Sequence, residues 1–127
     1  MFARREEDDY QPVAPGIRMR TLCFGSATLM SEFRLLQGHV LPRHAHPHEQ
    51  TGYLVSGHIA LTIGDETHDV VPGDSWCIIG GVEHGAQVLQ DSVAVEVSSP
   101  VREDYLPDEA EVDRRAGGED AAGASTP

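Results

Sequence analysis

Short apolar runs, each cut off by turn-forming residues, fill the middle of the chain. Each run has the length of a β-strand and is followed by Gly, Pro, Asp or Ser. No stretch repeats its apolar residues at helical spacing over several turns. The pattern therefore predicts an all-β fold, either a sandwich or a barrel. The predicted strands are residues 17–24, 28–36, 53–55, 59–63, 67–71, 75–79, 85–89 and 93–97.

Alternation within the last run assigns its residues to two faces. The valines of residues 93–97 share one face, whereas Ala94, Glu96 and Ser98 share the other. Such mixed faces suit a barrel with a partly polar lumen, or a sandwich with one solvated face, and alternation alone leaves both open. Two breaks between runs, Gly64-Asp65 and Gln90-Asp91, are predicted to be hairpin turns.

Length and charge divide the chain into a folded middle and two solvated ends. A length of 127 residues suits a single domain. The net charge is −12, and more than half of it lies in the first ten residues and after residue 100. We therefore expect a flexible N-terminal arm at residues 1–15, a folded domain at 16–107, and a disordered acidic tail at 108–127.

The composition also excludes several classes of function. A strongly acidic chain lacks the basic surface that nucleic-acid binding requires. All nine basic residues are arginine, which excludes Schiff-base chemistry on a lysine. The first residues contain no apolar signal segment, and no apolar run is long enough to cross a membrane. We expect a cytoplasmic protein with two reduced core thiols, Cys23 and Cys77, although their spacing leaves a disulfide open.

Four histidines crowd the segment RHAHPHEQTGYLVSGH at residues 43–58. Residues two apart on a strand point the same way, so His44 and His46 can converge on one metal ion. Gln50 could add an oxygen ligand, but His48 has the same parity, and Pro47 can shift the register. Parity places Glu49 on the opposite face.

A further ligand must come from another strand, and His84 is the candidate because it opens a run after Gly80-Gly81. Neutral imidazoles suit one divalent transition metal, whether Zn, Ni, Fe, Mn or Co. The competing interpretation is a polar, histidine-rich surface loop that binds nothing. The remaining histidines are expected at exposed turns or strand edges: His39, His58 and His68.

The spacing of these residues resembles the two sequence motifs of the cupins. Gly38 is followed by five residues, by His44-Ala45-His46, by three residues and Gln50, and by six residues and Gly57. This is the first cupin motif with its glutamate changed to glutamine. The second motif fits from Gly73 through Ile79-Gly80-Gly81 to His84 and Val88, with its proline and asparagine replaced. The resemblance implies a small double-stranded β-barrel, jelly-roll-like, with one metal held by His44, His46, Gln50 and His84, and it sets His48 aside.

Further segments resemble the small bacterial cupins of pectin degradation, among them HPHEQ, YLVSG, PGDS and SSPVREDYL. These cupins convert unsaturated uronates to a linear keto form, and their metal ligands are also three histidines and a glutamine. Arg102 matches their arginine, whereas Glu96 and Ser98 stand where they have an aspartate and a phenylalanine. The resemblance implies a homodimeric enzyme that isomerises or ring-opens a small carboxylated substrate. Related cupins suggest alternatives, namely an iron-dependent dioxygenase, a polyketide cyclase, or a non-catalytic binding protein.

Two residues are candidates for catalysis. Glu96 could serve as general acid or base near the metal, and Arg102 could bind a substrate carboxylate through two hydrogen bonds. In the competing interpretation Glu96 is an outward surface residue and Arg102 forms a salt bridge with the acidic tail.

Overall fold

The structure, a computed structural model, describes residues 1–107 of the chain. Strands dominate this part, which confirms the all-β prediction, and the tail predicted at residues 108–127 lies outside it. The elements are β1 (Gln11–Ala14), β2 (Ile17–Phe24), β3 (Leu29–Leu35), β4 (Val40–His44), β5 (Glu49–Ile63), β6 (Glu66–Val70), β7 (Ser75–Ile78), β8 (His84–Ser99) and the 3-10 helix η1 (Glu103–Tyr105). β1 falls within residues 1–15, where the sequence suggests an arm, and it pairs with β2.

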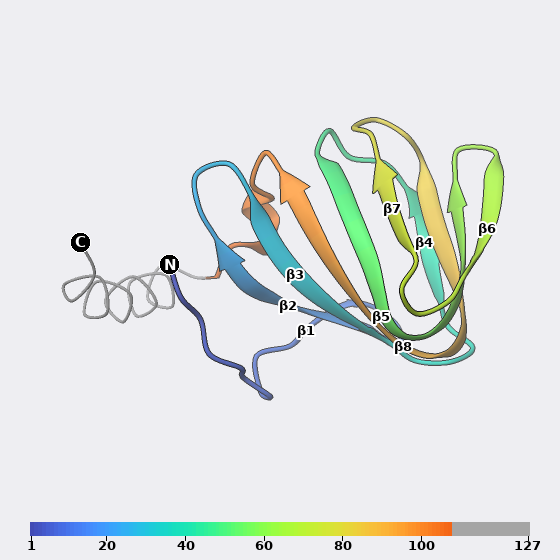
Figure 1. Cartoon of the computed structure of the whole chain (residues 1–127), viewed down its shortest axis with the longest axis horizontal. Helices are drawn as coiled ribbons and strands as arrows, with labels where there is room; N and C mark the ends of the chain where they lie inside the picture. Colours follow the sequence, from blue (N-terminus) through green and yellow to red (C-terminus); the bar gives the residue numbers. More distant parts are fainter. Residues whose placement is uncertain (108–127) are drawn as a thin grey trace.

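Two long, bent strands, β5 and β8, hold the fold together. They pair with each other along most of their length, and all strand pairs are antiparallel. The first half of β5 and the second half of β8 lie between β3 and β7. Their other halves lie between β4 and β6. The strands therefore form two facing layers that share β5 and β8, as the sweep of both strands across Figure 1 shows.

The bend depends on a contact between Gly57 and Ser92. Gly57 has a φ of 97°, which favours glycine, and a Cβ there would lie 2.1 Å from Oγ of Ser92. That hydroxyl accepts a hydrogen bond from the His58 amide at 3.0 Å and donates one to the Gln90 carbonyl at 2.7 Å. The hairpin predicted at Gln90-Asp91 is therefore wrong, because β8 bends there without reversing. The hairpin predicted at Gly64-Asp65 is confirmed by the pairing of β5 with β6.

The barrel core lies between the two layers. Its buried apolar residues come from five strands and include Met19, Phe33, Leu54, Leu61, Val70 and Val88. On β8 the buried Ala94 and Ser98 face this interior, whereas Val93, Val95 and Val97 are half-buried on the outer face. The structure is therefore a barrel with a partly polar lumen, which is one of the two arrangements that the alternation alone could not distinguish.

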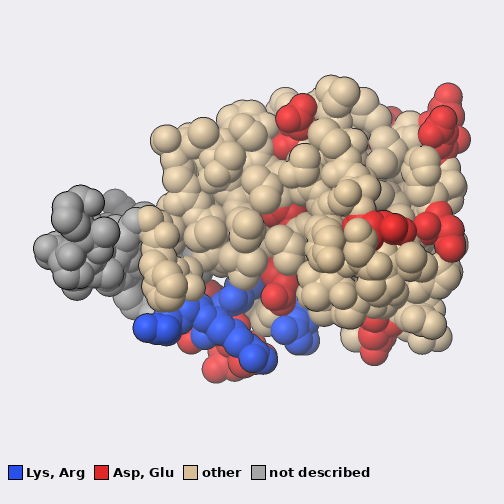
Figure 2. Space-filling model, in the orientation of Figure 1, with Lys and Arg blue, Asp and Glu red and all other residues tan. Residues whose placement is uncertain are grey.

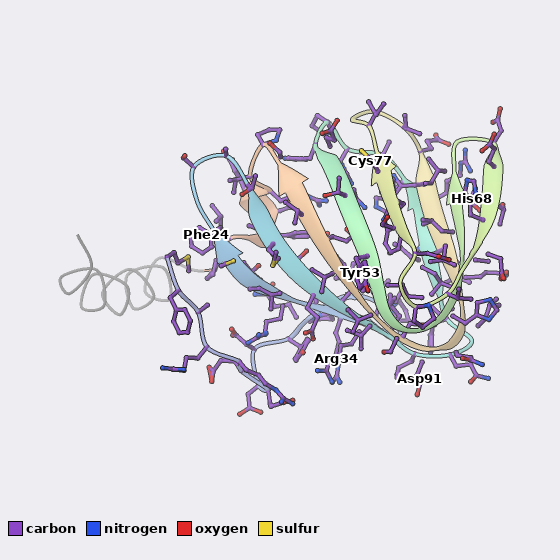
Figure 3. The ribbon with its side chains drawn as sticks, in the orientation of Figure 1. Phe24, Arg34, Tyr53, His68, Cys77 and Asp91 are labelled. Carbon is purple, nitrogen blue, oxygen red and sulfur yellow. The ribbon has the colours of Figure 1, made fainter. Side chains whose placement is uncertain are left out.

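In Figure 2 few charged side chains lie over the outer face of β3, β8 and β5. Tyr53 and Val55 are about half exposed there, at 50% and 49%, and Met30 is exposed at 36%. Figure 3 shows Tyr53 on this sheet, toward the viewer, and Arg34 near its lower edge.

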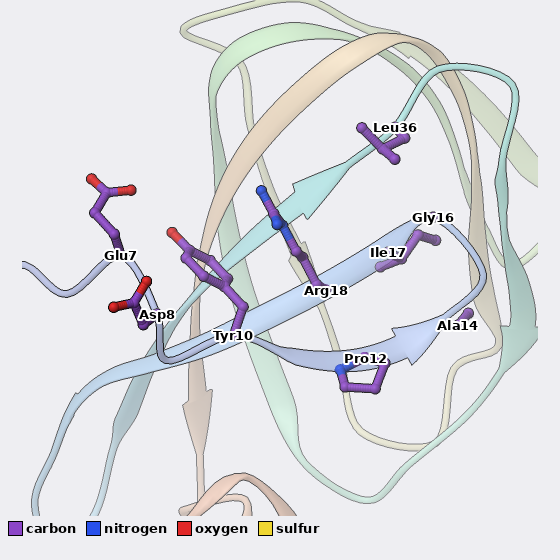
Figure 4. Close-up of a pocket in the computed structure, with 9 residues that line it drawn as sticks. All are labelled: Glu7, Asp8, Tyr10, Pro12, Ala14, Gly16, Ile17, Arg18 and Leu36. Atoms are coloured by element: carbon purple, nitrogen blue, oxygen red, sulfur yellow. The ribbon is translucent and has the colours of Figure 1, made fainter.

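The N-terminal segment packs against β2 and β3 through Tyr10. Its hydroxyl donates a hydrogen bond to Glu32, and its ring lies 5.0 Å from the Arg18 guanidinium and 5.2 Å from that of Arg34. A hollow of about 540 Å³ lies between this segment and β2, and Figure 4 shows Tyr10 and Arg18 at its wall. No histidine lines this hollow, so it is separate from the predicted metal site.

The two cysteines are free thiols, so they form no disulfide with each other. The expectation that both fill core positions is wrong for Cys77, which is exposed on the short strand β7. Within residues 1–107, no helix has the length and apolar character needed to cross a membrane.

Candidate metal centre and active site

Three histidines from separate segments meet at one end of the barrel. His44 ends β4, His84 begins β8 opposite it, and His46 lies in the loop between β4 and β5. The ring centroid of His84 lies 4.2 Å from that of His44 and 4.9 Å from that of His46. One possible ligand atom from each residue lies within 4.8 Å of the others, so the three are positioned to bind a metal ion.

Hydrogen bonds to the backbone orient all three rings. Nδ1 of His44 lies 2.8 Å from the Pro42 carbonyl, and Nδ1 of His84 lies 2.9 Å from the Val82 carbonyl. Nδ1 of His46 contacts the carbonyl of His48 at 3.0 Å. A carbonyl only accepts, so each Nδ1 carries the proton and each Nε2 offers a lone pair.

Two of these Nε2 atoms are inaccessible to solvent. Nε2 of His46 and of His84 is buried and has no hydrogen-bond partner among the described residues. Burial lowers the pKa of His46, with help from the positive charge of Arg102, and burial also lowers the pKa of His84. Neutral, oriented imidazoles with unpartnered lone pairs fit a divalent metal ion.

The loop that carries His46 depends on two glycines. The amide of Gly81 donates a hydrogen bond to the His46 carbonyl at 2.8 Å. A Cβ on Gly80 would lie 2.2 Å from the carbonyl oxygen of Pro47, so only glycine allows this approach. The parity argument assumed one strand from His44 to Gln50, and this is wrong, because β4 ends at His44.

Gln50 lies beside the cluster at the start of β5, and only 5% of it is exposed. The Gln50 side chain raises the pKa of His46, against the effect of burial, so it lies close to the His46 ring. His48 is half-buried with its ring centroid 5.6 Å from that of His46, and Glu49 is exposed. His48 does not belong to the converging group, although its carbonyl orients His46.

The other histidines lie outside the cluster, and two are less exposed than predicted. His39 is half-buried because its ring covers Gly16, where a Cβ would lie 2.2 Å from it. His58 is half-buried and pairs with Asp69. His68 is exposed, as predicted.

Glu96 projects from β8 into the lumen, on the same face as Ala94 and Ser98. Glu96 is half-buried, and the part of its side chain that remains accessible faces the lumen. Burial raises the pKa of Glu96 to about 7, and the charge of Arg102 opposes that rise. An outward surface position for Glu96 is thus excluded.

Arg102 lies against the same space with its side chain 12% exposed. Its Nε and Nη2 donate to the two carboxylate oxygens of Asp104 at 2.9 and 2.6 Å. Its guanidinium carbon lies 4.0 Å from the centroid of the Tyr105 ring. Arg102 holds the pKa of Asp104 below its usual range through this pair. One edge of the guanidinium is therefore paired with Asp104, and one face packs against the Tyr105 ring.

A pocket of about 370 Å³ opens beside this pair at the edge of the barrel between β1 and β4. Its wall includes His44, Arg102 and Tyr105 together with apolar residues such as Met19 and Leu41. A small molecule in this pocket would contact both a metal-cluster histidine and the arginine.

Sequence reasoning missed two residues of this region, Asp104 and Trp76. Asp104 follows Arg102 by two positions, but no spacing rule outside helices and strands predicts such a pair. Trp76 lies on the lumen face of β7 against Gly52, and only the strand register reveals this contact.

Comparisons with known proteins agree with this architecture. The Cupin domain family matches residues 31–98. KdgF from Halomonas sp. is 30% identical, with a TM-score of 0.78 over 84% of this chain and 98% of that protein. An RmlC-like cupin from Shewanella frigidimarina is 22% identical, with a TM-score of 0.74 over 84% of this chain and 100% of the other.

More distant structures share only the fold. Salicylate 1,2-dioxygenase from Pseudoaminobacter salicylatoxidans is 17% identical, with a TM-score of 0.66 over 68% of this chain and 26% of that protein. No protein with a curated description matches the sequence. The match to the domain family spans more than half of the chain, and both cupin motifs lie in the converging strands and loops described above. The chain belongs to the cupin family.

Proposed function

We propose that this cupin is a metal-dependent enzyme that isomerises or ring-opens an unsaturated sugar acid or a related carboxylated small molecule. The observation that carries the proposal is the placement of Glu96 and Arg102 near the three oriented imidazoles. The charge of Arg102 lowers the pKa of His46 and opposes the rise in the pKa of Glu96, so Arg102 lies close to both residues. Similarity to KdgF favours this reaction class, whereas the substituted residues Glu96 and Ser98 leave the individual substrate to experiment.

The proposed metal ligands are His44, His46, His84 and Gln50. All four are neutral, so they would leave the full charge of one divalent ion, whether Zn, Ni, Fe, Mn or Co, uncompensated. Such an ion supplies Lewis acidity toward a substrate oxygen.

The remaining steps fall to Arg102 and Glu96. Arg102, held in place by Asp104 and Tyr105, would bind the substrate carboxylate through the edge of its guanidinium that does not face Asp104. For a 4,5-unsaturated uronate, Glu96 would take the proton of the anomeric hydroxyl as the ring C1–O bond breaks, and would deliver a proton to C4 as the C4=C5 double bond gives way to the C5 carbonyl. A carboxyl that titrates near pH 7 suits this exchange, because both its forms are populated at that pH.

Two alternatives rest on the same cluster. Three histidines with open positions could hold Fe(II) in a dioxygenase, and a cupin can also bind a metal or ligand without catalysis. Oxygen consumption with Fe(II) and a panel of aromatic acids would favour the first. Metal binding without turnover of any substrate would favour the second.

We also propose that the protein is a cytoplasmic homodimer that acts on a small molecule without nucleic-acid or membrane partners. The apolar outer face of β3, β8 and β5, which includes Tyr53 and Val95, is the proposed dimer interface. Tyr53→Glu should yield monomers in light scattering, because it places a charge in an apolar interface. An unchanged dimer in that variant would place the interface elsewhere.

The decisive experiment is an activity screen on 4,5-unsaturated uronates, followed by their ultraviolet absorbance. We expect turnover that a chelator abolishes and a divalent metal restores. Glu96→Gln should lose turnover while it keeps the metal, and Glu66→Gln, which changes an exposed carboxylate, should behave like the wild type. Turnover that survives in Glu96→Gln would exclude the proposed role of Glu96.

A further inference from the structure

Trp76 is the only tryptophan of the chain, and its ring rests on the backbone of Gly52. A Cβ on Gly52 would lie 2.2 to 2.4 Å from three atoms of the Trp76 indole. Only a residue without a side chain therefore leaves room for the ring. Trp76 and Gly52 are register partners in β7 and β5, so the ring lies on the lumen face of the sheet.

Gly52 is also the register partner of Glu96 on its other side. Cross-strand partners project to the same face, so the Trp76 ring and the Glu96 carboxyl lie on either side of a position that has no side chain. Figure 1 shows β8, β5 and β7 side by side in this order. The indole thus lies across the space next to the carboxyl.

Among the described residues, the ionisable groups that act on Glu96 come from one segment. Arg102 opposes the rise that burial causes in the pKa of Glu96, and burial raises the pKa of Tyr105, with a smaller contribution from Glu96. Its register partner in β3 is Ser31, which does not ionise at these pH values. The β5 and β7 side of Glu96 is therefore formed by a glycine and the Trp76 indole, whose buried Nε1 has no hydrogen-bond partner among the described residues.

Beyond the indole lies an open pocket of about 600 Å³ at the edge where β6 meets β7. Trp76 lines it together with Leu61, Val70 and the exposed His68. The indole thus stands between this pocket and the lumen in which Glu96 lies.

We propose that Trp76 is a positioning residue for Glu96, closing the β7 side of the lumen so that water from the neighbouring pocket does not reach the carboxyl. The proposal rests on the function proposed for Glu96 and adds the residue that controls its surroundings. A carboxyl against an indole in a dry pocket holds its proton to higher pH than one in water.

The first test uses Trp76 as its own reporter. Emission of the full-length protein is followed from pH 5 to 9, because the charge of a nearby carboxylate changes indole emission. We expect a step with pH that is missing in Glu96→Gln, where the charge cannot form. Persistence of the same step in Glu96→Gln would overturn the proposal, since the step would then report another group.

The second test moves the ring. Gly52→Ala forces the indole away and should abolish most of the step, whereas Gly25→Ala, where a Cβ meets nothing within 4 Å, should leave it intact. Trp76→Ala should lower the midpoint of Glu96 titration by about one pH unit or more, read from the pH dependence of unfolding, and Trp76→Phe should preserve most of it. A midpoint unchanged in Trp76→Ala would refute the role of Trp76, and Gly52→Ala decides the question should Trp76→Ala fail to fold.

These readouts separate the two proposals. None of them requires turnover, so a protein inactive on uronates but with a Glu96-dependent step would refute the proposed reaction and support the Trp76 contact. An active enzyme without that step would support the reaction and refute the contact.

Discussion

Replacing Glu96 by glutamine should make the protein more stable at alkaline pH but not at acidic pH. Burial raises the pKa of Glu96 to about 7, whereas a glutamate in an unfolded chain titrates near about 4.3. Between these values the folded protein keeps a proton that the unfolded chain has released. The free energy of unfolding therefore falls as pH rises through this window, and the effect is complete above pH 7.

The size of the effect follows from the separation of the two pKa values. One pKa unit corresponds to about 1.4 kcal/mol, so the ionised Glu96 destabilises the fold by up to roughly 3 to 4 kcal/mol above pH 7. About 2.5 kcal/mol of this change should fall between pH 5 and 8. Glutamine has the same shape without the charge, so any cost of its buried amide should be the same at every pH.

Urea unfolding of both proteins at several pH values, followed by tryptophan emission in the presence of a chelator, measures this difference. We expect Glu96→Gln to gain about 2.5 kcal/mol relative to the wild type between pH 5 and 8. A stability difference that is the same at both pH values would refute the reasoning, because Glu96 would then be solvated in the folded state.

Three further substitutions test separate parts of the structure. Arg102→Lys should raise KM for a carboxylated substrate by roughly 10- to 100-fold, because a charge-assisted bidentate contact is lost, and an unchanged KM in steady-state kinetics would exclude that contact. Gly57→Ala should lower the free energy of unfolding by about 2 kcal/mol or more, since its φ of 97° and the Ser92 hydroxyl oppose a side chain, whereas Gly25→Ala serves as the matched control in urea unfolding. Gln50→Glu should bind the metal more tightly in competition with a chelator, because it adds a negative ligand, and weaker binding would remove Gln50 from the ligand set.

Much of the barrel could be predicted because alternation and turn residues are local signals. The two faces of β8 follow directly from which residues alternate, and the turn at Gly64-Asp65 needs only its two residues. The bend of β8 at Gln90-Asp91 could not be predicted in this way. It depends on Ser92 packing against Gly57, a contact between residues far apart in sequence.

The metal cluster likewise depends partly on local signals in the sequence and partly on contacts between distant residues. Motif spacing selected His44, His46 and His84, and the structure brings their rings together. Strand parity gave the wrong reason for His46, because glycines near residue 80 hold its loop in place. The contact of Trp76 with Gly52 left no local signal, since it arises only when β7 pairs with β5.

The central claim, that this cupin holds one divalent metal through its converging histidines, is tested most directly by the metal content of the purified full-length protein. Elemental analysis should find about one transition-metal ion per chain in the wild type and in His68→Ala, whose exposed histidine lies outside the cluster. His84→Ala should lose most of that metal while it remains folded. Full metal occupancy in His84→Ala, or none in the wild type after growth and dialysis with the metal, would contradict the account.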